Sequence, residues 1–130
     1  MISFHANHVA VTREDWGDLV MLSADEDLGS EQYLMLQAKD RYDDQDVHLG
    51  MDDIYVETCG QGWSWYGNIE LFELTRNCVS VQLSRDAATR MGHDGKIEAT
   101  FSLGETAFAH LRKTLQKIFD GEDYYRDLTV

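Results

Sequence analysis

The sequence predicts an α+β domain in which an antiparallel sheet of about six or seven strands carries a C-terminal amphipathic helix on one face. Apolar and polar residues alternate through most of residues 1–83, and after Leu83 the period changes to that of a helix. The length of 130 residues and the 43% content of hydrophobic residues suit a domain with its own core. We therefore predict a single domain over 1–130, with a strand-rich part (1–83), a mixed part (84–121) and a tail (122–130).

Alternating segments separated by turn residues make up the strand-rich part. The expected strands cover about residues 3–11, 18–24, 32–38, 54–59, 65–75 and 79–83. Residues 25–30 and 60–62 interrupt the alternation with glycine and polar side chains, and Arg76-Asn77 separates the last two strands. Because these connections are short, the sequence favours an antiparallel meander, with residues 40–53 as a polar loop.

The mixed part contains two expected helices. Ser84 can accept a hydrogen bond as the N-cap of a short helix through Met91, and Gly92 can end that helix in the left-handed conformation. A strand is expected over 96–102. From Glu105 to Phe119 apolar residues recur three or four positions apart, which predicts an amphipathic helix. The tail is expected to be loose or to add an edge strand.

Charge is distributed unevenly along the chain. The formal net charge is −13, and residues 1–75 hold 16 Asp and Glu against 3 Lys and Arg, whereas residues 76–130 hold 8 of each. Residues 40–53 alone carry six aspartates against the single cation Arg41. An acidic surface serves solubility or a basic partner, and it opposes binding to the phosphate backbone of nucleic acid.

The sequence lacks the motifs of several other classes of protein. No apolar run is long enough for a membrane helix, and the first residues lack the pattern of a secretory signal, so we expect a cytoplasmic protein without a membrane partner. Cys59 and Cys78 are then expected to be reduced thiols in the core. The histidine spacing predicts no zinc site, and the aspartates near Asp44 fit a calcium loop poorly, so neither metal nor cofactor is expected.

Enzymatic motifs are also missing from the sequence, which contains no nucleophile elbow, P-loop or dinucleotide fingerprint. Glu57 and Glu70 stay open as acid or base groups, because each lies among aromatic residues where burial could raise its pKa.

Aromatic residues are densest around the glycine-rich turn between residues 55 and 70. Tyr55, Trp63, Trp65 and Tyr66 all fall here. Trp65 and Tyr66 are neighbours on an expected strand, so they must face opposite sides of the sheet, and at least one should leave the core. Exposed Trp and Tyr side chains beside carboxylates make good anchors for a protein partner.

Three segments resemble a known family. The runs Tyr33–Gln37, Asp53–Glu57 and Tyr66–Glu70, the last leading into Phe72–Arg76, are similar to the immunity protein 10 family of bacterial polymorphic toxin systems. The order of segments extends to the C-terminal helix, so the resemblance covers nearly the whole chain. It implies a small cytoplasmic antidote that binds and neutralises a cognate toxin, with no catalytic residue to carry over.

The sequence therefore predicts a non-enzymatic toxin inhibitor, monomeric or homodimeric, whose toxin is basic, for example a nuclease. The expected partner-binding residues are Asp43, Asp44, Asp46, Asp52, Asp53, Trp63, Trp65 and Tyr66. Two alternatives remain. One is a self-associating structural or regulatory domain that uses the same aromatic residues, and the other is a small hydrolase or ligand-binding protein with Glu57 or Glu70 in a pocket beside Trp65.

Overall fold

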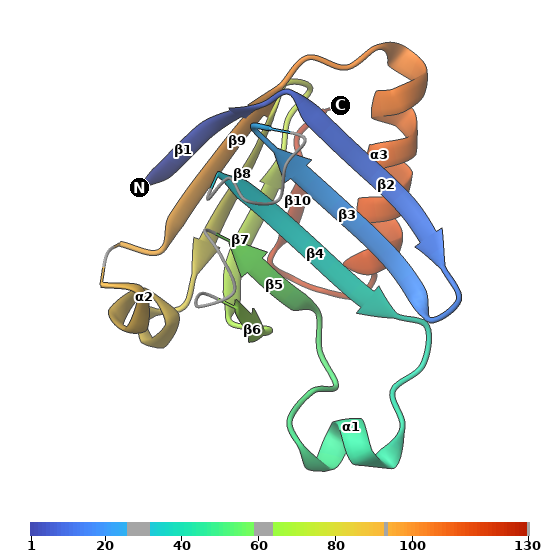
Figure 1. The fold of residues 1–130 in the computed structure, drawn as a ribbon, viewed down its shortest axis with the longest axis vertical. Helices are drawn as coiled ribbons and strands as arrows, with labels where there is room; N and C mark the ends of the chain where they lie inside the picture. Colours follow the sequence, from blue (N-terminus) through green and yellow to red (C-terminus); the bar gives the residue numbers. More distant parts are fainter. Residues whose placement is uncertain (26–31, 59–63, 93, 130) are drawn as a thin grey trace.

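A computed structural model describes residues 1–25, 32–58, 64–92 and 94–129 of the chain (Figure 1). The strands in these residues are β1 (Ile2–Ala6), β2 (His8–Glu14), β3 (Gly17–Ser23), β4 (Tyr33–Lys39), β5 (Tyr55–Thr58), β6 (Ser64–Tyr66), β7 (Ile69–Leu74), β8 (Cys78–Leu83), β9 (Lys96–Phe101) and β10 (Tyr125–Asp127). The helices are α1 (Asp44–His48), α2 (Arg85–Met91) and α3 (Glu105–Ile118).

The strands form two five-stranded sheets rather than one. Sheet A has the order β1-β9-β8-β7-β10, and its two edge strands, β1 and β10, run parallel to their neighbours β9 and β7. Sheet B has the order β2-β3-β4-β5-β6 and is antiparallel throughout. The α+β class and the C-terminal helix are confirmed, whereas the prediction of a single antiparallel sheet is wrong.

The division into two sheets arises at two bends that the sequence alternation concealed. The segment expected as one strand over 3–11 breaks at Asn7, so that β1 lies in sheet A and β2 in sheet B. The segment expected over 65–75 breaks at Gly67 and Asn68, whose φ angles of 73° and 64° turn the chain from β6 in sheet B to β7 in sheet A. Gly and Asn adopt this left-handed conformation at least cost.

The core lies between the two sheets. Sheet B contributes side chains such as Leu34, Leu36 and Val56, and sheet A contributes side chains such as Phe72 and Val79, all of them fully buried. The helix α3 packs on the core side of sheet A, where its Phe108 ring lies 6.2 Å from that of Phe101 and Phe119, directly after the helix, lies 4.5 Å from Phe72. It also contacts β2 and β3 (Figure 1).

The local signals in the mixed part are confirmed. Ser84 caps α2 by accepting a hydrogen bond from the backbone N–H of Ala87, and Gly92 ends the helix with a φ of 76°. The tail adds the edge strand β10, one of its two expected forms.

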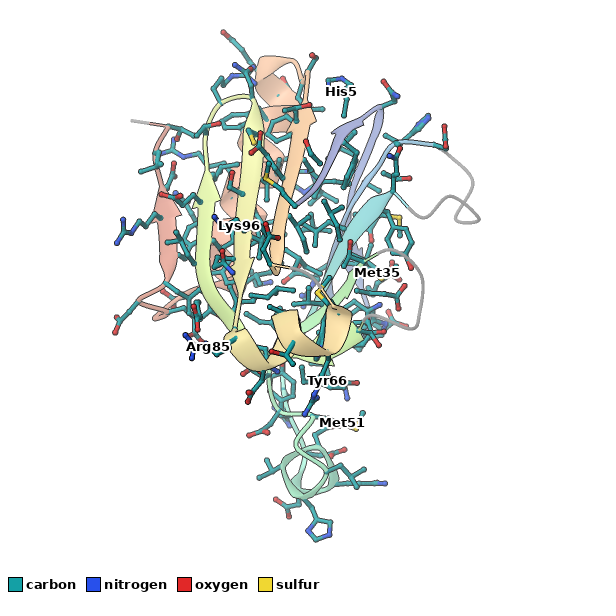
Figure 2. The ribbon with its side chains drawn as sticks, turned by 90° about the vertical axis from the view of Figure 1, so that its left-hand side faces the viewer. His5, Met35, Met51, Tyr66, Arg85 and Lys96 are labelled. Carbon is teal, nitrogen blue, oxygen red and sulfur yellow. The ribbon has the colours of Figure 1, made fainter. Side chains whose placement is uncertain are left out.

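The outward faces of the two sheets differ in character. Polar side chains dominate the outer face of sheet A, namely Glu73, Ser80, Gln82, Lys96 and Glu98. Half-buried apolar and aromatic side chains lie on the outer face of sheet B, namely Leu19, Met21, Met35, Tyr55 and Tyr66. Figure 2 places Lys96 on the sheet A side and Met35 on the sheet B side. No helix in the described ranges covers sheet B's outer face (Figure 1).

Candidate partner-binding site

Residues 40–53, which connect β4 to β5, form a lobe that projects from one end of the sandwich and carries α1 at its tip (Figures 1 and 2). The sequence predicted a polar loop here, and α1 is an addition to that prediction. We call residues 40–53 the α1 lobe.

The helix α1 is only five residues long, and hydrogen bonds cap it at both ends. At its start the carboxylate of Asp43 accepts from the N–H of Asp46 at 2.8 Å, and the carboxylate of Asp46 accepts from the N–H of Asp43 at 3.1 Å, which forms a capping box. At its end Gly50, with a φ of 71°, and Met51 donate to the carbonyls of Val47 and Asp46. These two bonds form a Schellman motif. The caps explain how so short a helix is held.

An ion pair fixes the α1 lobe to sheet B, a hydrogen bond closes the base of the lobe, and another joins the residue directly after it to the β6–β7 corner. Lys39 Nζ donates to both carboxylate oxygens of Asp46, at 3.0 and 3.1 Å. These hydrogen bonds lower the pKa of Asp46 and raise the pKa of Lys39, so both groups stay charged near neutral pH. The hydroxyl of Tyr42 donates to the carbonyl of Asp53, and the N–H of Gly67 donates to the carbonyl of Ile54. These contacts position the α1 lobe against the sandwich.

The six aspartates of the lobe divide into two groups. Asp40 pairs with Arg13, and Asp46 is buried and pairs with Lys39. The other four are exposed and have no ion-pair partner among the described residues: Asp43, Asp44, Asp52 and Asp53. Four of the five predicted aspartates thus point their charge to solvent, while Asp46 has a structural role.

The tip of the lobe also carries apolar side chains. Val47 is 56% exposed and Leu49 is 58% exposed. Met51 follows them and is partly buried where the lobe meets the sandwich (Figure 2). A solvated loop has no need of such residues, because exposing them to water is unfavourable. Apolar side chains surrounded by carboxylates are typical of a surface that a partner covers.

The predicted aromatic anchors have different positions. Trp65 lies on the core side of β6 and is 9% exposed, so its assignment to the binding surface is corrected: it packs in the core. Tyr66 lies on the outer face, as the opposite orientation of neighbouring strand residues requires, and its ring lies 5.2 Å from that of Tyr55. Trp63 lies outside the described residues.

Beside the α1 lobe, the outer face of sheet B contains a hollow of about 240 Å³. Its lining consists of four aromatic residues, two polar residues and one carboxylate: Trp16, Tyr42, Tyr55, Tyr66, Gln37, Lys39 and Asp53. We call it the aromatic hollow. Trp16 comes from the β2–β3 turn and is 38% exposed. Figure 2 shows Tyr66 at the lower end of the sandwich, next to the lobe.

A second hollow, of about 290 Å³, lies at the base of the lobe and shares Lys39, Tyr42 and Asp53 with the aromatic hollow. Ion pairs occupy much of its wall. The largely buried carboxylate of Asp18 lies 3.0 Å from Lys117 Nζ and 3.3 Å from Arg13, which also binds Asp40. These pairs tie α3 to sheet B, whereas Asp52, Asp53 and Glu122 of the same lining have no ion-pair partner among the described residues.

The two carboxylates considered for acid–base chemistry do not form a site with Trp65. Glu57 is buried, but it lies on the outer face of sheet B, whereas Trp65 lies on the inner face. Its carboxylate accepts hydrogen bonds of 2.6 Å from the hydroxyls of Tyr33 and Tyr55. Glu70 is exposed on β7. The described residues therefore do not form the pocket that the hydrolase alternative requires.

Sequence reasoning missed Val47, Leu49 and Trp16 as parts of the site. The helical tip had a local signal, because Asp43 and Asp46 have capping-box spacing and Gly50 follows at the position of a left-handed cap. Trp16 had no such signal, since only the pairing of β3 with β4 and of β4 with β5 brings its hairpin beside Tyr55.

Fold and site together define a small acidic domain with a preformed surface suited to binding another molecule. The chain belongs to the Immunity protein 10 family, whose model matches residues 5–109, and that description indicates a toxin-neutralising role. No curated protein and no solved structure matches the chain.

Two further findings concern membrane spanning and metal binding by the described residues. The helices of those ranges are too short and too polar to cross a membrane. Nor does any group of three histidine, cysteine or carboxylate side chains come together there as a metal site.

Proposed function

We propose that this chain is a non-enzymatic immunity protein of a bacterial polymorphic toxin system, which acts in the cytoplasm by binding a cognate toxin with a basic surface, such as a nuclease. The observation that supports this proposal is the α1 lobe, where four exposed, unpaired aspartates surround two exposed apolar side chains. Family membership supplies the toxin-neutralising role, and the lobe suggests how it is performed.

Each group on this surface has a different task. The carboxylates of Asp43, Asp44, Asp52 and Asp53 attract a basic partner at long range and raise the rate of association. The apolar residues Val47 and Leu49, together with Tyr66, lose water in the complex and slow its dissociation. Trp63 stays a predicted anchor from the sequence alone.

The direct test is to capture the toxin and measure its inhibition. The immobilised chain should retain a basic toxin fragment from a lysate of its own cells at low salt, and mass spectrometry would identify it. The purified toxin should then lose its activity when one equivalent of this chain is added. A toxin that stays fully active in the presence of excess chain would refute the proposal.

Matched variants test the surface. In the double variant Asp44→Asn, Asp52→Asn, association with the toxin should slow by about fivefold and depend less on salt, because rim charges act mainly on the association rate. The control Asp86→Asn, Glu105→Gln removes the same charge from α2 and from the first turn of α3, which are both outside the lobe. Equal slowing in both variants would contradict the assignment to the lobe.

An anchor should behave differently from a rim charge. Tyr66→Ala should weaken binding by about 2 kcal/mol, mostly through faster dissociation. If Tyr66→Ala lost no more affinity than the substitution of a single rim aspartate, Tyr66 would not be an anchor.

Self-association is a second candidate, favoured by the apolar side chains on the outer face of sheet B, which no helix of the described ranges covers. Sedimentation at increasing protein concentration distinguishes the two. A stable dimer whose formation Met35→Glu abolishes would support this alternative, and a monomer at high concentration would exclude it.

A further inference from the structure

The aromatic hollow has the composition of a receptor for a cation. Four of its seven lining residues are Trp or Tyr, and the face of an aromatic ring attracts a positive charge. Its volume of about 240 Å³ is smaller than the roughly 300–1,000 Å³ of pockets that enclose drug-sized ligands. It is therefore suited to one side chain of a partner rather than to a separate small molecule.

The charged groups of the hollow leave one carboxylate available. Asp53 accepts through Oδ1 from the N–H of Ile54, and its Oδ2 has no hydrogen-bond donor among the described residues. The cation in the wall, Lys39, is already neutralised because its ammonium binds both oxygens of Asp46. A positively charged guest would thus meet a free carboxylate instead of net repulsion.

Two tyrosines of the hollow, Tyr42 and Tyr55, are fixed and neutral. The hydroxyl of Tyr42 donates to the carbonyl of Asp53, and the hydroxyl of Tyr55 donates to Glu57 Oε1 at 2.6 Å. Burial raises the pKa of Tyr42, and burial with the neighbouring Glu57 carboxylate raises the pKa of Tyr55, so both phenols stay protonated at neutral pH. With these hydroxyls committed to the protein, the rings are held in place for a guest.

We propose that the aromatic hollow binds the guanidinium group of one arginine side chain of the partner, with the rings stacking on it and the free oxygen of Asp53 accepting its N–H groups. Arginine suits the site better than lysine, because a planar guanidinium both stacks on aromatic rings and donates in a fixed fork to a carboxylate. That this arginine belongs to a toxin rests on the proposed function, whereas the binding chemistry of the hollow does not.

The test uses the full chain and a small probe, with no toxin present. N-acetyl-arginine methylamide is titrated into ¹⁵N-labelled protein, and the indole N–H signal of Trp16 is followed by NMR after assignment with Trp16→Phe. The neutral isostere N-acetyl-citrulline methylamide serves as the matched probe. We expect a saturable shift with the arginine probe and binding about tenfold weaker with the citrulline probe.

Two carboxylate variants provide the control. Asp53→Asn should weaken binding of the arginine probe about fivefold, and Asp86→Asn, which removes the same charge from α2 and does not line the hollow, should leave it unchanged. Tyr66→Leu, which keeps an apolar side chain but removes a ring, should weaken binding as well, and the remaining amide signals would show that this variant is folded.

Three results would overturn the inference: no saturable shift of the Trp16 signal, equal binding of the two probes, or equal weakening by Asp86→Asn and Asp53→Asn. Because no toxin takes part, failure here leaves the toxin-capture experiment intact. Conversely, a failed capture would leave the guanidinium site standing and remove only the identity of its partner.

Discussion

Replacing Asp127 by asparagine should produce a loss of stability that disappears in acid. Asp127 lies in β10, and its Oδ2 accepts from Arg112 Nε at 2.6 Å and from Gln116 Nε2 at 3.1 Å, both on α3. Its Oδ1 accepts from the N–H of Thr129 at 3.0 Å and from the hydroxyl of the same residue. This carboxylate therefore joins the last strand to the last helix.

The size of the effect follows from the pKa of Asp127. Burial alone would raise this pKa, but the hydrogen bonds from Thr129 and Arg112 outweigh burial and lower it from 3.8 to about 2. A shift of that size corresponds to at most about 2.5 kcal/mol of stability at neutral pH. The Asp127 side chain is 15% exposed and Arg112 more so, and because solvent screens the pair we expect about 1 kcal/mol.

The direction of the pKa shift of Asp127 determines the pH range in which this carboxylate stabilises the fold. A carboxylate whose pKa is lower in the folded chain than in the unfolded chain adds stability above the unfolded value, and this contribution is lost as the pH falls through the folded value. The difference between wild type and Asp127→Asn in the free energy of unfolding should therefore be full above about pH 5 and should be mostly lost by about pH 2.

Urea unfolding followed by tryptophan fluorescence between pH 2 and pH 7 measures this difference. Asp123→Asn, an exposed acid two residues before β10, is the control and should change stability little at any pH. A deficit of Asp127→Asn that stays constant across the range would refute the electrostatic reasoning.

Two further predictions concern backbone geometry. Gly17→Ala should lower the free energy of unfolding in urea by about 2 kcal/mol or more, because the added Cβ would lie 2.0 Å from the carbonyl oxygen of Ala38 on β4. Gly104→Ala, whose Cβ meets open space, should lower it clearly less. Similar losses in the two variants would contradict the clash. Asp43→Ala should remove the capping box of α1 and make the amide hydrogens of residues 46–51 exchange about fivefold faster without moving the thermal midpoint. Unchanged exchange there would show that the cap does not hold the helix.

The sequence predicted best those elements whose signals are local. Ser84 and Gly92 mark the ends of α2, and the spacing of apolar residues defines α3, because a helix forms its hydrogen bonds within one segment. Strand alternation is equally local, which is why most strands were placed correctly. Alternation shows which side of a strand is apolar, but it does not show which sheet the strand joins. The bends at Asn7 and at Gly67-Asn68 were missed for that reason.

The candidate site was predictable only in part. The composition of residues 40–53 located the acidic lobe, and the alternation rule placed Tyr66 and Trp65 on opposite faces without saying which was outside. The aromatic hollow could not be foreseen, because its residues come from separate parts of the chain. Trp16 lies in the β2–β3 turn, Tyr42 in the β4–β5 connection and Tyr66 in β6. Such a site depends on the pairing of the strands, which no single stretch of sequence records.

The parallel pairing of β1 with β9 imposes an order on folding during synthesis. Ile2 pairs with Ile97, so β1 has to wait for 95 further residues before its partner exists. At a synthesis rate of about 5–20 residues per second, this wait lasts about 5–20 seconds. Sheet B, whose neighbours in space are also neighbours in sequence, can pair long before that time. The apolar inner face of sheet B then stays exposed to solvent for seconds. A chaperone that covers this face has those seconds in which to act.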